Sequence, residues 1–279
     1  MENRNLPPAF YGDGQTNPSQ NLVNAFPAIN GYPVGHPLSD YDPQQPYQNR
    51  DERLKRTIYC NGMALEFDGR ELQIYYDTET EQPAFDAPGY FRENTRTGYY
   101  LKKWISRKPE MLDVDNIKSD FHMHPLLRRA EIYLNYAEAS NQAAGPEGIV
   151  PQCDRSAVSI INEIRQKSGG ITNTSYVAET ANKGKRAFNE LILNERRLEL
   201  AFENHRYFDL RRWKLDLDHT IYGVTIEKNA QGLVYDGTDP FGEQIEVERR
   251  EIQGEKYYYT PLFYSELVKS PNMKNNKGW

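Results

Sequence analysis

The segment ERRLELAFENHRYFDLRRW (195–213) concentrates side chains that could do chemistry. It carries three glutamates, five arginines and one aspartate among apolar residues. Glu195, Glu199 and Glu203 are spaced four residues apart, so on a helix they share one face. Carboxylates gathered in this way could serve general acid–base catalysis or hold a metal ion.

The neighbouring residues favour a structural role instead. A carboxylate-bridged metal site uses a Glu-x-x-His pair, whereas here Glu203 and His205 are two residues apart and point in different directions. The arginines can neutralise every nearby carboxylate through planar, bidentate contacts. We therefore predict an ion-pair network, with no catalytic and no metal-binding residue in this segment. The arginines in question are Arg196, Arg197, Arg206, Arg211 and Arg212.

Other chemical motifs are sparse. His122 and His124 flank Met123, and the remaining histidines are scattered. No phosphate-binding glycine loop, nucleophile elbow, zinc-protease or dinucleotide motif occurs, so we predict a non-enzymatic chain without a cofactor. Cys60 and Cys153 belong to no metal or redox motif, and two separate buried thiols are expected, although an oxidised pair stays open.

Composition narrows the classes further. The 279 residues can form one large domain or two smaller ones. A net charge of −6 disfavours binding to nucleic acid, and no apolar run is long enough to cross a membrane. The 20 tyrosines suit two roles, rigid packing of irregular loops and stacking against sugar rings.

Three regions differ in their patterns. Residues 1–123 read as ordered loops with β-hairpins: 1–56 are rich in turn signals, 57–76 indicate strand–turn–strand around Asn61-Gly62 and Asp68-Gly69, and a short strand YYLKKWI follows a loop. Residues 124–213 read as helical hairpins. Residues 214–279 read as loops with a hairpin near 221–235, an extended KYYYTPLF segment, a helical turn at 265–267 and a polar tail.

The helical region has clear punctuation. A first helix is predicted from Pro125 to Gly145, and a second from an Asp154 N-cap to Gly169-Gly170. The second presents Ala157, Ile160, Ile161 and Ile164 as one stripe. A third helix is predicted from about Gly184 to Phe202. The expected fold class is mainly α, with tetratricopeptide-like helical hairpins, long ordered loops and small β-hairpins.

Several ordered motifs resemble one known family. LLRRAEIYLNYAEASNQ, AVSIINEIRQKSGG and LILNERRLELAFENHRYFDLRRWK, in this order and spacing, are similar to segments of the SusD/RagB family. NLVNAFPAINGYPV, YDPQQPYQNRDERL, TGYYLKKW and the closing YYYTPLFYSELVKSPNMKNNKGW resemble its flanking segments. The departures are Glu52, Asn204 and Lys277, where the family usually has Pro, Gly and Pro. Asn tolerates the left-handed backbone, so a helix-ending turn at Asn204 is still expected.

The resemblance implies a function. Family members are outer-membrane nutrient-binding lipoproteins of polysaccharide utilization, exposed at the cell surface. They bind a glycan or oligosaccharide and pass it to a SusC-like TonB-dependent transporter. The chain resembles only the C-terminal portion of the family, whose other half carries the lipid anchor and most tetratricopeptide helices. Without those helices an exposed apolar flank is expected. By this resemblance the charged segment belongs to the scaffold, away from the ligand site.

The resemblance places ligand contacts on aromatic loops. A sugar site needs flat rings together with amide or carboxylate groups. The loop at 75–92 and the first loop supply candidate ligand-binding residues: Tyr75, Tyr76, Asp77, Phe85, Tyr90 and Phe91, and Tyr32 and Tyr41. For each of them, packing of an ordered loop by its own aromatics stays an alternative. A helical protein- or peptide-interaction module without sugar binding, and an enzyme of unrecognised type, also stay open.

Overall fold

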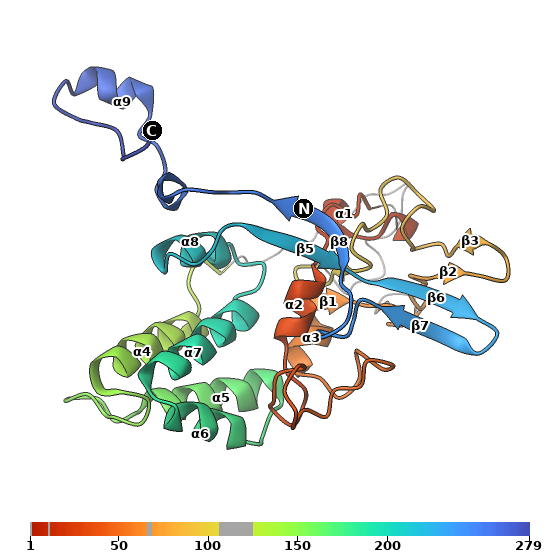
Figure 1. Cartoon of the computed structure of the whole chain (residues 1–279), viewed down its shortest axis with the longest axis horizontal. Coiled ribbons are helices and arrows are strands. Elements are labelled where there is room, and N and C mark those ends of the chain that lie inside the picture. Colours follow the sequence, from red (N-terminus) through yellow and green to blue (C-terminus); the bar gives the residue numbers. More distant parts are fainter. Residues whose placement is uncertain (1, 11, 66–68, 106–124) are drawn as a thin grey trace.

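A computed structural model describes residues 2–10, 12–65, 69–105 and 125–279 (Figure 1). The helices are α1 (Glu2–Asn5), α2 (Gln20–Ala25), α3 (Glu52–Thr57), α4 (Arg129–Ala144), α5 (Ala157–Gly169), α6 (Ser175–Asn182), α7 (Lys185–Glu199), α8 (His205–Arg212) and α9 (Tyr264–Lys269), with the short 3-10 turns η1 (Pro8–Phe10) and η3 (Glu255–Tyr258). The strands are β1 (Ile58–Tyr59), β2 (Tyr76–Asp77), β3 (Gln82–Pro83), β4 (Tyr100–Leu101), β5 (His219–Gly223), β6 (Thr225–Asn229), β7 (Gly232–Asp236) and β8 (Ile245–Arg250).

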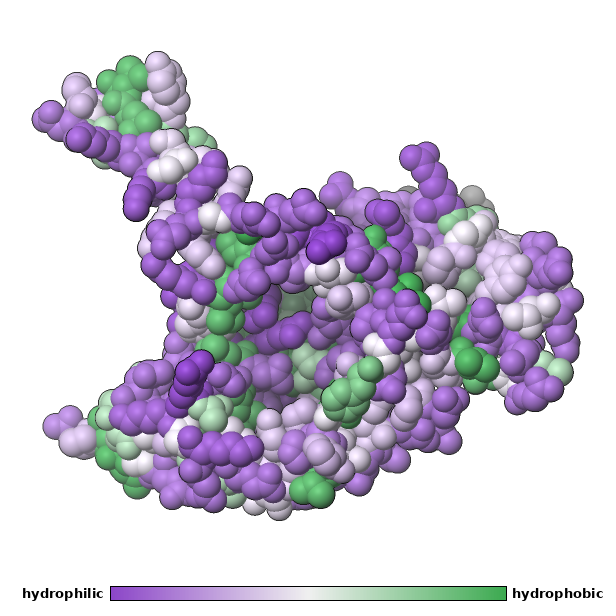
Figure 2. Space-filling model, viewed as in Figure 1, coloured by the Kyte–Doolittle hydropathy of each residue, from purple (hydrophilic) through white to green (hydrophobic). Residues whose placement is uncertain are grey.

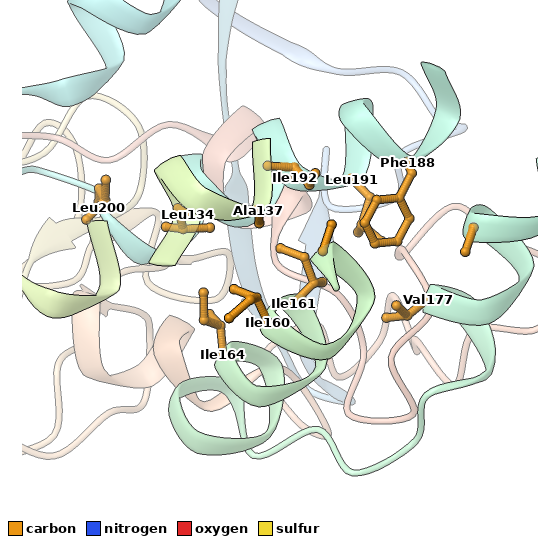
Figure 3. Packing of buried hydrophobic residues seen from close by; sticks show 12 residues of the cluster. Leu134, Ala137, Ile160, Ile161, Ile164, Val177, Phe188, Leu191, Ile192 and Leu200 are labelled. Atoms are coloured by element: carbon orange, nitrogen blue, oxygen red, sulfur yellow. The ribbon is translucent and has the colours of Figure 1, made fainter. Parts of the chain in front are cut away.

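The helices α4 to α7 pack around one apolar cluster (Figure 3). The predicted stripe of α5 faces this cluster, where Ile160, Ile161 and Ile164 meet Phe188 and Ile192 of α7. Burying a large apolar side chain contributes about 1.5–3 kcal/mol, so this cluster is the main source of stability in the helical part. The contacts of α4 with α5 and α7 are consistent with the expected helical hairpins.

The observed helix limits correct two predictions. The first helix begins at Arg129 and not at Pro125, because Arg128 is extended (φ −119°, ψ 150°) and its guanidinium reaches Glu199 and Glu203. The predicted N-cap Asp154 is replaced by Ser156, whose hydroxyl accepts a hydrogen bond from the Ser159 amide at 3.2 Å. Gly145 (φ 86°) and Gly170 (φ 70°) end their helices as predicted.

The third predicted helix ends early. α7 stops at Glu199, and Phe202 (φ 61°) and Asn204 (φ 64°) then adopt the left-handed backbone before α8 begins. The turn expected at Asn204 is confirmed. The sequence patterns also missed α6, a helix of Ser175–Asn182 whose buried side chains Val177 and Ala181 complete the cluster.

The strands form small sheets outside the helical region α4–α7. β3-β2-β6-β7 is the largest, with β2 parallel to β6, while β1 pairs with β4 and β5 with β8. The predicted hairpin near 221–235 is confirmed as β6 and β7. The strand–turn–strand predicted over 57–76 is confirmed in part: β1 pairs with β4, but the two arms are joined by an antiparallel bridge between Ala64 and Glu71. Backbone hydrogen bonds from Gly62 to Leu72 and from Leu72 to Met63 flank this bridge. The predicted Asp68 turn lies partly outside the described residues.

The N-terminal loops are ordered, as predicted, by buried anchors. Val23 and Phe26 are fully buried against Leu54 and Tyr99. The guanidinium of Arg50 donates hydrogen bonds to the carbonyl oxygens of Pro46, Val23 and Phe26 at 2.6–2.7 Å. A single cation thus bonds three backbone carbonyls of the N-terminal region and ties the end of α2 to the loop before α3.

The C-terminal residues form an arm that leaves the body after β8 (Figure 1). The predicted helical turn at 265–267 is confirmed within α9, but the start of KYYYTPLF folds as η3 and not as an extended segment. The Trp279 indole donates hydrogen bonds to the carbonyl oxygens of Lys256 and Tyr259, which closes the arm on itself.

The two cysteines differ in burial. Cys60 is buried, which raises the pKa of its thiol, whereas Cys153 is exposed, so the expectation of a buried thiol is wrong for Cys153. Neither is in a disulfide. Among the helices that the structure describes, none combines the length and the apolar character that crossing a bilayer requires.

Candidate ligand-binding site

The charged segment forms an ion-pair network, as predicted, but its three glutamates pair with cations outside the segment and not with its own arginines. The network is centred on Glu195. Its side chain is fully buried, and its two oxygens lie 2.8 Å from Arg53 and 2.6 Å from Arg165. Arg53 also pairs with Asp51, the N-cap residue of α3. The network therefore ties α3, α5 and α7 together.

The other carboxylates of the segment are paired as well. Glu199 lies 3.1 Å from Arg128, and Glu203 lies 2.8 Å from Arg128 and 2.5 Å from Lys103. Asp209 accepts from Arg196 at 2.8 Å and from Arg212 at 2.9 Å. These contacts suit a scaffold, because each carboxylate is held by at least one cation.

Acid should weaken this scaffold. Burial alone would raise the pKa of Glu195, but Arg53 and Arg165 outweigh it and hold the pKa below its ordinary value of 4.5. A lowered folded-state pKa contributes stability above the unfolded value and loses it as pH falls through the folded value. The urea midpoint should therefore drop between about pH 5 and pH 3. A midpoint that stays constant over this range would contradict the assignment.

Three aromatic side chains of the 75–92 loop come together. Phe85, Tyr90 and Phe91 have ring centroids 4.8–5.2 Å apart in tilted and edge-to-face contacts. Tyr90 is 47% exposed and Phe91 38% exposed, while Phe85 lies partly buried beneath them. We call these three rings the aromatic platform.

Buried polar groups fix the loop that carries the platform. The Asp86 carboxylate accepts from the Gln73 amide at 2.9 Å, and burial raises the pKa of this carboxyl. The Asn94 side-chain amide donates to the carbonyl oxygens of Phe85 and Ala87 at 3.0 and 2.7 Å. The rings are thus positioned before any ligand arrives, which reduces the entropy lost on binding.

Two residues that sequence reasoning missed support the platform. The Arg70 guanidinium lies 4.2 Å from the Phe10 ring centroid and 5.6 Å from that of Phe85, and it contacts Asp86 at 3.3 Å. No local pattern links these positions, because Phe10 comes from the N-terminal segment. Arg70 therefore links the N-terminal segment to the loop that carries the platform.

The predicted residues Tyr75, Tyr76 and Asp77 precede the platform residue Phe85 by about ten positions in the sequence. Tyr76 is 41% exposed and pairs across the strands with Pro83, two residues before Phe85. The Tyr75 ring is half-buried and lies 5.3 Å from the Lys228 ammonium. The backbone amides of Thr80 and Glu79 lower the pKa of Asp77, which also pairs with Lys228 at 3.5 Å. Tyr76 is the exposed ring of this group.

Tyr32 and Tyr41 are placed elsewhere. The Tyr32 hydroxyl donates to Glu179 of α6 at 2.5 Å, which raises the pKa of Tyr32, and its ring packs against His36 and Tyr176. The Tyr41 hydroxyl donates to the Thr238 carbonyl at 2.8 Å. Both contacts are those of loop packing, and neither residue contacts the platform.

Metal ligands are not gathered in the described part of the chain, where no group of three or more His, Cys, Asp or Glu side chains is arranged to hold an ion. The arrangement at the platform offers flat apolar faces with polar neighbours. This chemistry is that of a binding surface.

Comparisons with known proteins agree on one family. The SusD family matches residues 2–279. The chain is 36% identical over 183 residues to SusD-like protein P25 of Formosa agariphila, which covers 61% of this chain and 31% of that protein. It is 31% identical over 147 residues to SusD-like protein P38 of the same organism, covering 52% and 26%.

Solved structures show the same fold. A SusD-like protein from Bacteroides fragilis has a TM-score of 0.62 at 26% identity, covering 96% of this chain and 48% of that chain. A second protein of that organism, described as a SusD-like carbohydrate binding protein, has a TM-score of 0.66 at 22% identity, covering 98% and 51%. The chain thus spans about half the length of these solved proteins and matches about a third of the curated ones.

Proposed function

This chain belongs to the SusD family, and we propose that it binds a glycan or oligosaccharide as a component of an outer-membrane nutrient-uptake complex. The observation that carries the proposal is the aromatic platform, with two exposed rings on a loop held in place by Asp86 and Asn94. Aromatic rings contribute a large, rigid apolar area at little conformational cost. The apolar face of a sugar ring can stack on such a surface while its hydroxyls reach polar neighbours.

The polar neighbours are available around the platform. Arg92 and Glu93 follow Phe91 and are exposed, and the Arg70 side chain is about one-third exposed. Carboxylate and guanidinium groups bind adjacent sugar hydroxyls through charge-assisted hydrogen bonds. We therefore place the ligand over Tyr90 and Phe91, with Tyr76 as an additional contact, and assign a binding role and not a catalytic one.

The partner and location are part of this proposal. Family membership supports delivery of the ligand to a SusC-like TonB-dependent transporter at the cell surface. The C-terminal arm offers an apolar surface for a protein contact, since Phe263 and Tyr264 are each 81% exposed. Exposed apolar groups of this kind are typical of protein interfaces.

Removing the platform should abolish most sugar affinity. The double variant Tyr90→Ala/Phe91→Ala should bind an oligosaccharide identified on a glycan array about 5–30-fold more weakly, which corresponds to about 1–2 kcal/mol. Calorimetric titration measures the affinity, and thermal melting checks that both proteins are folded. Since the two rings are exposed, the melting temperature should change little.

The arm provides a matched control for this experiment. Phe263→Ala/Tyr264→Ala also removes one phenylalanine and one tyrosine side chain, but from another exposed site. This variant should leave the affinity for the oligosaccharide unchanged. If the platform variant and the unmodified chain bind the oligosaccharide with equal affinity, the ligand does not bind at the platform. No binding to any glycan by the folded chain, together with binding to a peptide or protein, would favour the interaction-module alternative.

A further inference from the structure

Three of the five arginines of the charged segment stand apart from the ion-pair network. Arg196 and Arg212 both contact Asp209, as predicted. Arg197 and Arg206, in contrast, have no carboxylate within 4.0 Å among the residues that the structure describes. Arg211 likewise has no such carboxylate in the described part of the chain, and its guanidinium donates to the Tyr207 carbonyl oxygen at 3.0 Å. The prediction that the arginines of the segment hold its carboxylates is therefore confirmed at Asp209 for Arg196 and Arg212 and wrong for the other three.

The side chains of Arg197 and Arg206 line the same cavity. This cavity has a volume of about 590 Å³ and lies between α2, α8 and β5. Figure 2 shows a recess in the middle of this face, between the positions of α2 and β5 in Figure 1. Its volume is in the range of small-molecule binding sites.

Positive charge dominates the lining of the cavity. Arg250 joins Arg197 and Arg206 there, and Asp216 is the carboxylate among the described lining residues. The acid partner of Arg250 is Glu248, which does not line the cavity. We call this site the cationic cavity. It is a local inversion of charge in a chain with a net charge of −6.

Arg197 is held in place although Arg206 repels it. Burial, followed by the charge of Arg206, lowers the pKa of Arg197 to about 10. The Arg197 guanidinium donates one hydrogen bond to the Asn21 carbonyl oxygen at 3.0 Å. Asn21 is itself fixed, because its side chain bonds the Thr220 carbonyl and the Tyr222 amide of β5. The remaining guanidinium donors of Arg197 are free to meet a ligand.

We propose that the cationic cavity binds the anionic group of an acidic glycan, a carboxylate or sulfate held between Arg197 and Arg206. This inference rests on the proposed glycan-binding function and adds a second site, distinct from the aromatic platform. Guanidinium groups recognise such oxyanions through paired hydrogen bonds. Asn17, Ser19 and Asn204 of the lining supply amide and hydroxyl groups for sugar hydroxyls, and the half-exposed Tyr207 supplies a ring.

Local charge, and not net charge, decides this interaction. At physiological ionic strength, charges separated by more than about 8 Å are largely screened. An anion inside the cavity meets the lining cations directly, while the acidic groups elsewhere on the chain are screened. The net negative charge therefore does not oppose binding at this site.

Three trisaccharides of equal length test the proposal: one bearing uronic acids, one bearing sulfates, and one neutral. Titration of the chain should show at least ten-fold tighter binding of one or both acidic sugars than of the neutral one. Arg197→Gln/Arg206→Gln should lose this preference, and the two acidic sugars distinguish carboxylate from sulfate. Raising the salt concentration from about 50 to 500 mM should weaken the binding of acidic sugars to the unmodified chain. This measurement does not depend on the folding of any variant.

Matched controls separate this site from the platform. Arg186→Gln/Arg249→Gln changes the net charge equally at exposed positions outside the cavity and should leave the preference intact. Tyr90→Ala/Phe91→Ala tests the platform, so failure of one site is distinguishable from failure of the other. Equal affinity for neutral and acidic sugars, an unchanged preference in Arg197→Gln/Arg206→Gln, or binding of a poly-glutamate peptide in place of acidic sugars would overturn the proposal.

Discussion

Replacing Glu195 by glutamine is expected to lower the free energy of unfolding by about 3–5 kcal/mol. Glu195 is fully buried between Arg53 and Arg165, which are themselves buried. Glutamine keeps the shape but removes the charge, so two desolvated cations lose their shared counter-ion. Since folded domains are stable by about 5–15 kcal/mol, this loss is a large fraction of the total stability.

Urea titration followed by circular dichroism measures this loss. Glu190→Gln is the matched control: it lies on the same helix, its side chain is 72% exposed, and its contact with Arg186 is 4.0 Å long. That control should change stability by less than about 0.5 kcal/mol. A cost below about 1 kcal/mol for Glu195→Gln would contradict the central place of Glu195 in the network.

A double-mutant cycle sharpens the test. Arg165→Gln alone should also be costly, because it leaves Glu195 with fewer cations. Combining it with Glu195→Gln should cost less than the sum of the two, with a coupling of about 0.5–3 kcal/mol. Additive costs would mean that the two residues stabilise the fold independently.

The second large effect concerns the apolar cluster of the helices. Phe188 of α7 is fully buried among side chains from α4, α5 and α6 (Figure 3). Phe188→Ala should lower the free energy of unfolding by about 3–5 kcal/mol, because it removes apolar burial and leaves a cavity.

Phe208→Ala serves as the comparison for Phe188→Ala. Phe208 is 65% exposed on α8, so its truncation should cost less than about 0.5 kcal/mol. The same urea titration measures both. Similar losses in the two variants would mean that the cluster around Phe188 does not carry the stability of the helical part.

Sequence patterns predicted the features that depend on local residues. The α5 stripe, the glycines that end α4 and α5, the left-handed Asn204 and the β6–β7 hairpin each follow from side-chain periodicity or turn chemistry. Charge density predicted that the segment around Glu195 forms ion pairs, but not that Arg53 and Arg165 are the partners of Glu195. Family resemblance supplied the fold class as a whole.

Features that depend on distant contacts were missed. α4 begins at Arg129 because the preceding Arg128 binds glutamates about 70 residues away in the chain. β1 pairs with β4 and not with its sequence neighbour, which buries Tyr59 and Tyr100. No local pattern encodes either choice.

The candidate site divides in the same way. Phe85, Tyr90 and Phe91 form the aromatic platform because they share one short loop. Tyr32 and Tyr41 have the same residue type, but tertiary partners outside their loop use their hydroxyls. Arg70 and the cationic cavity could be found only once the fold had brought distant segments together.

We propose that the aromatic platform holds a sugar. A crystal structure of the chain with an oligosaccharide selected on a glycan array tests it most directly. We expect a sugar ring stacked on Tyr90 and Phe91, with its hydroxyls bonded to polar groups beside the platform. A sugar bound elsewhere, with no contact to either ring, would show that the platform is not the sugar-binding site.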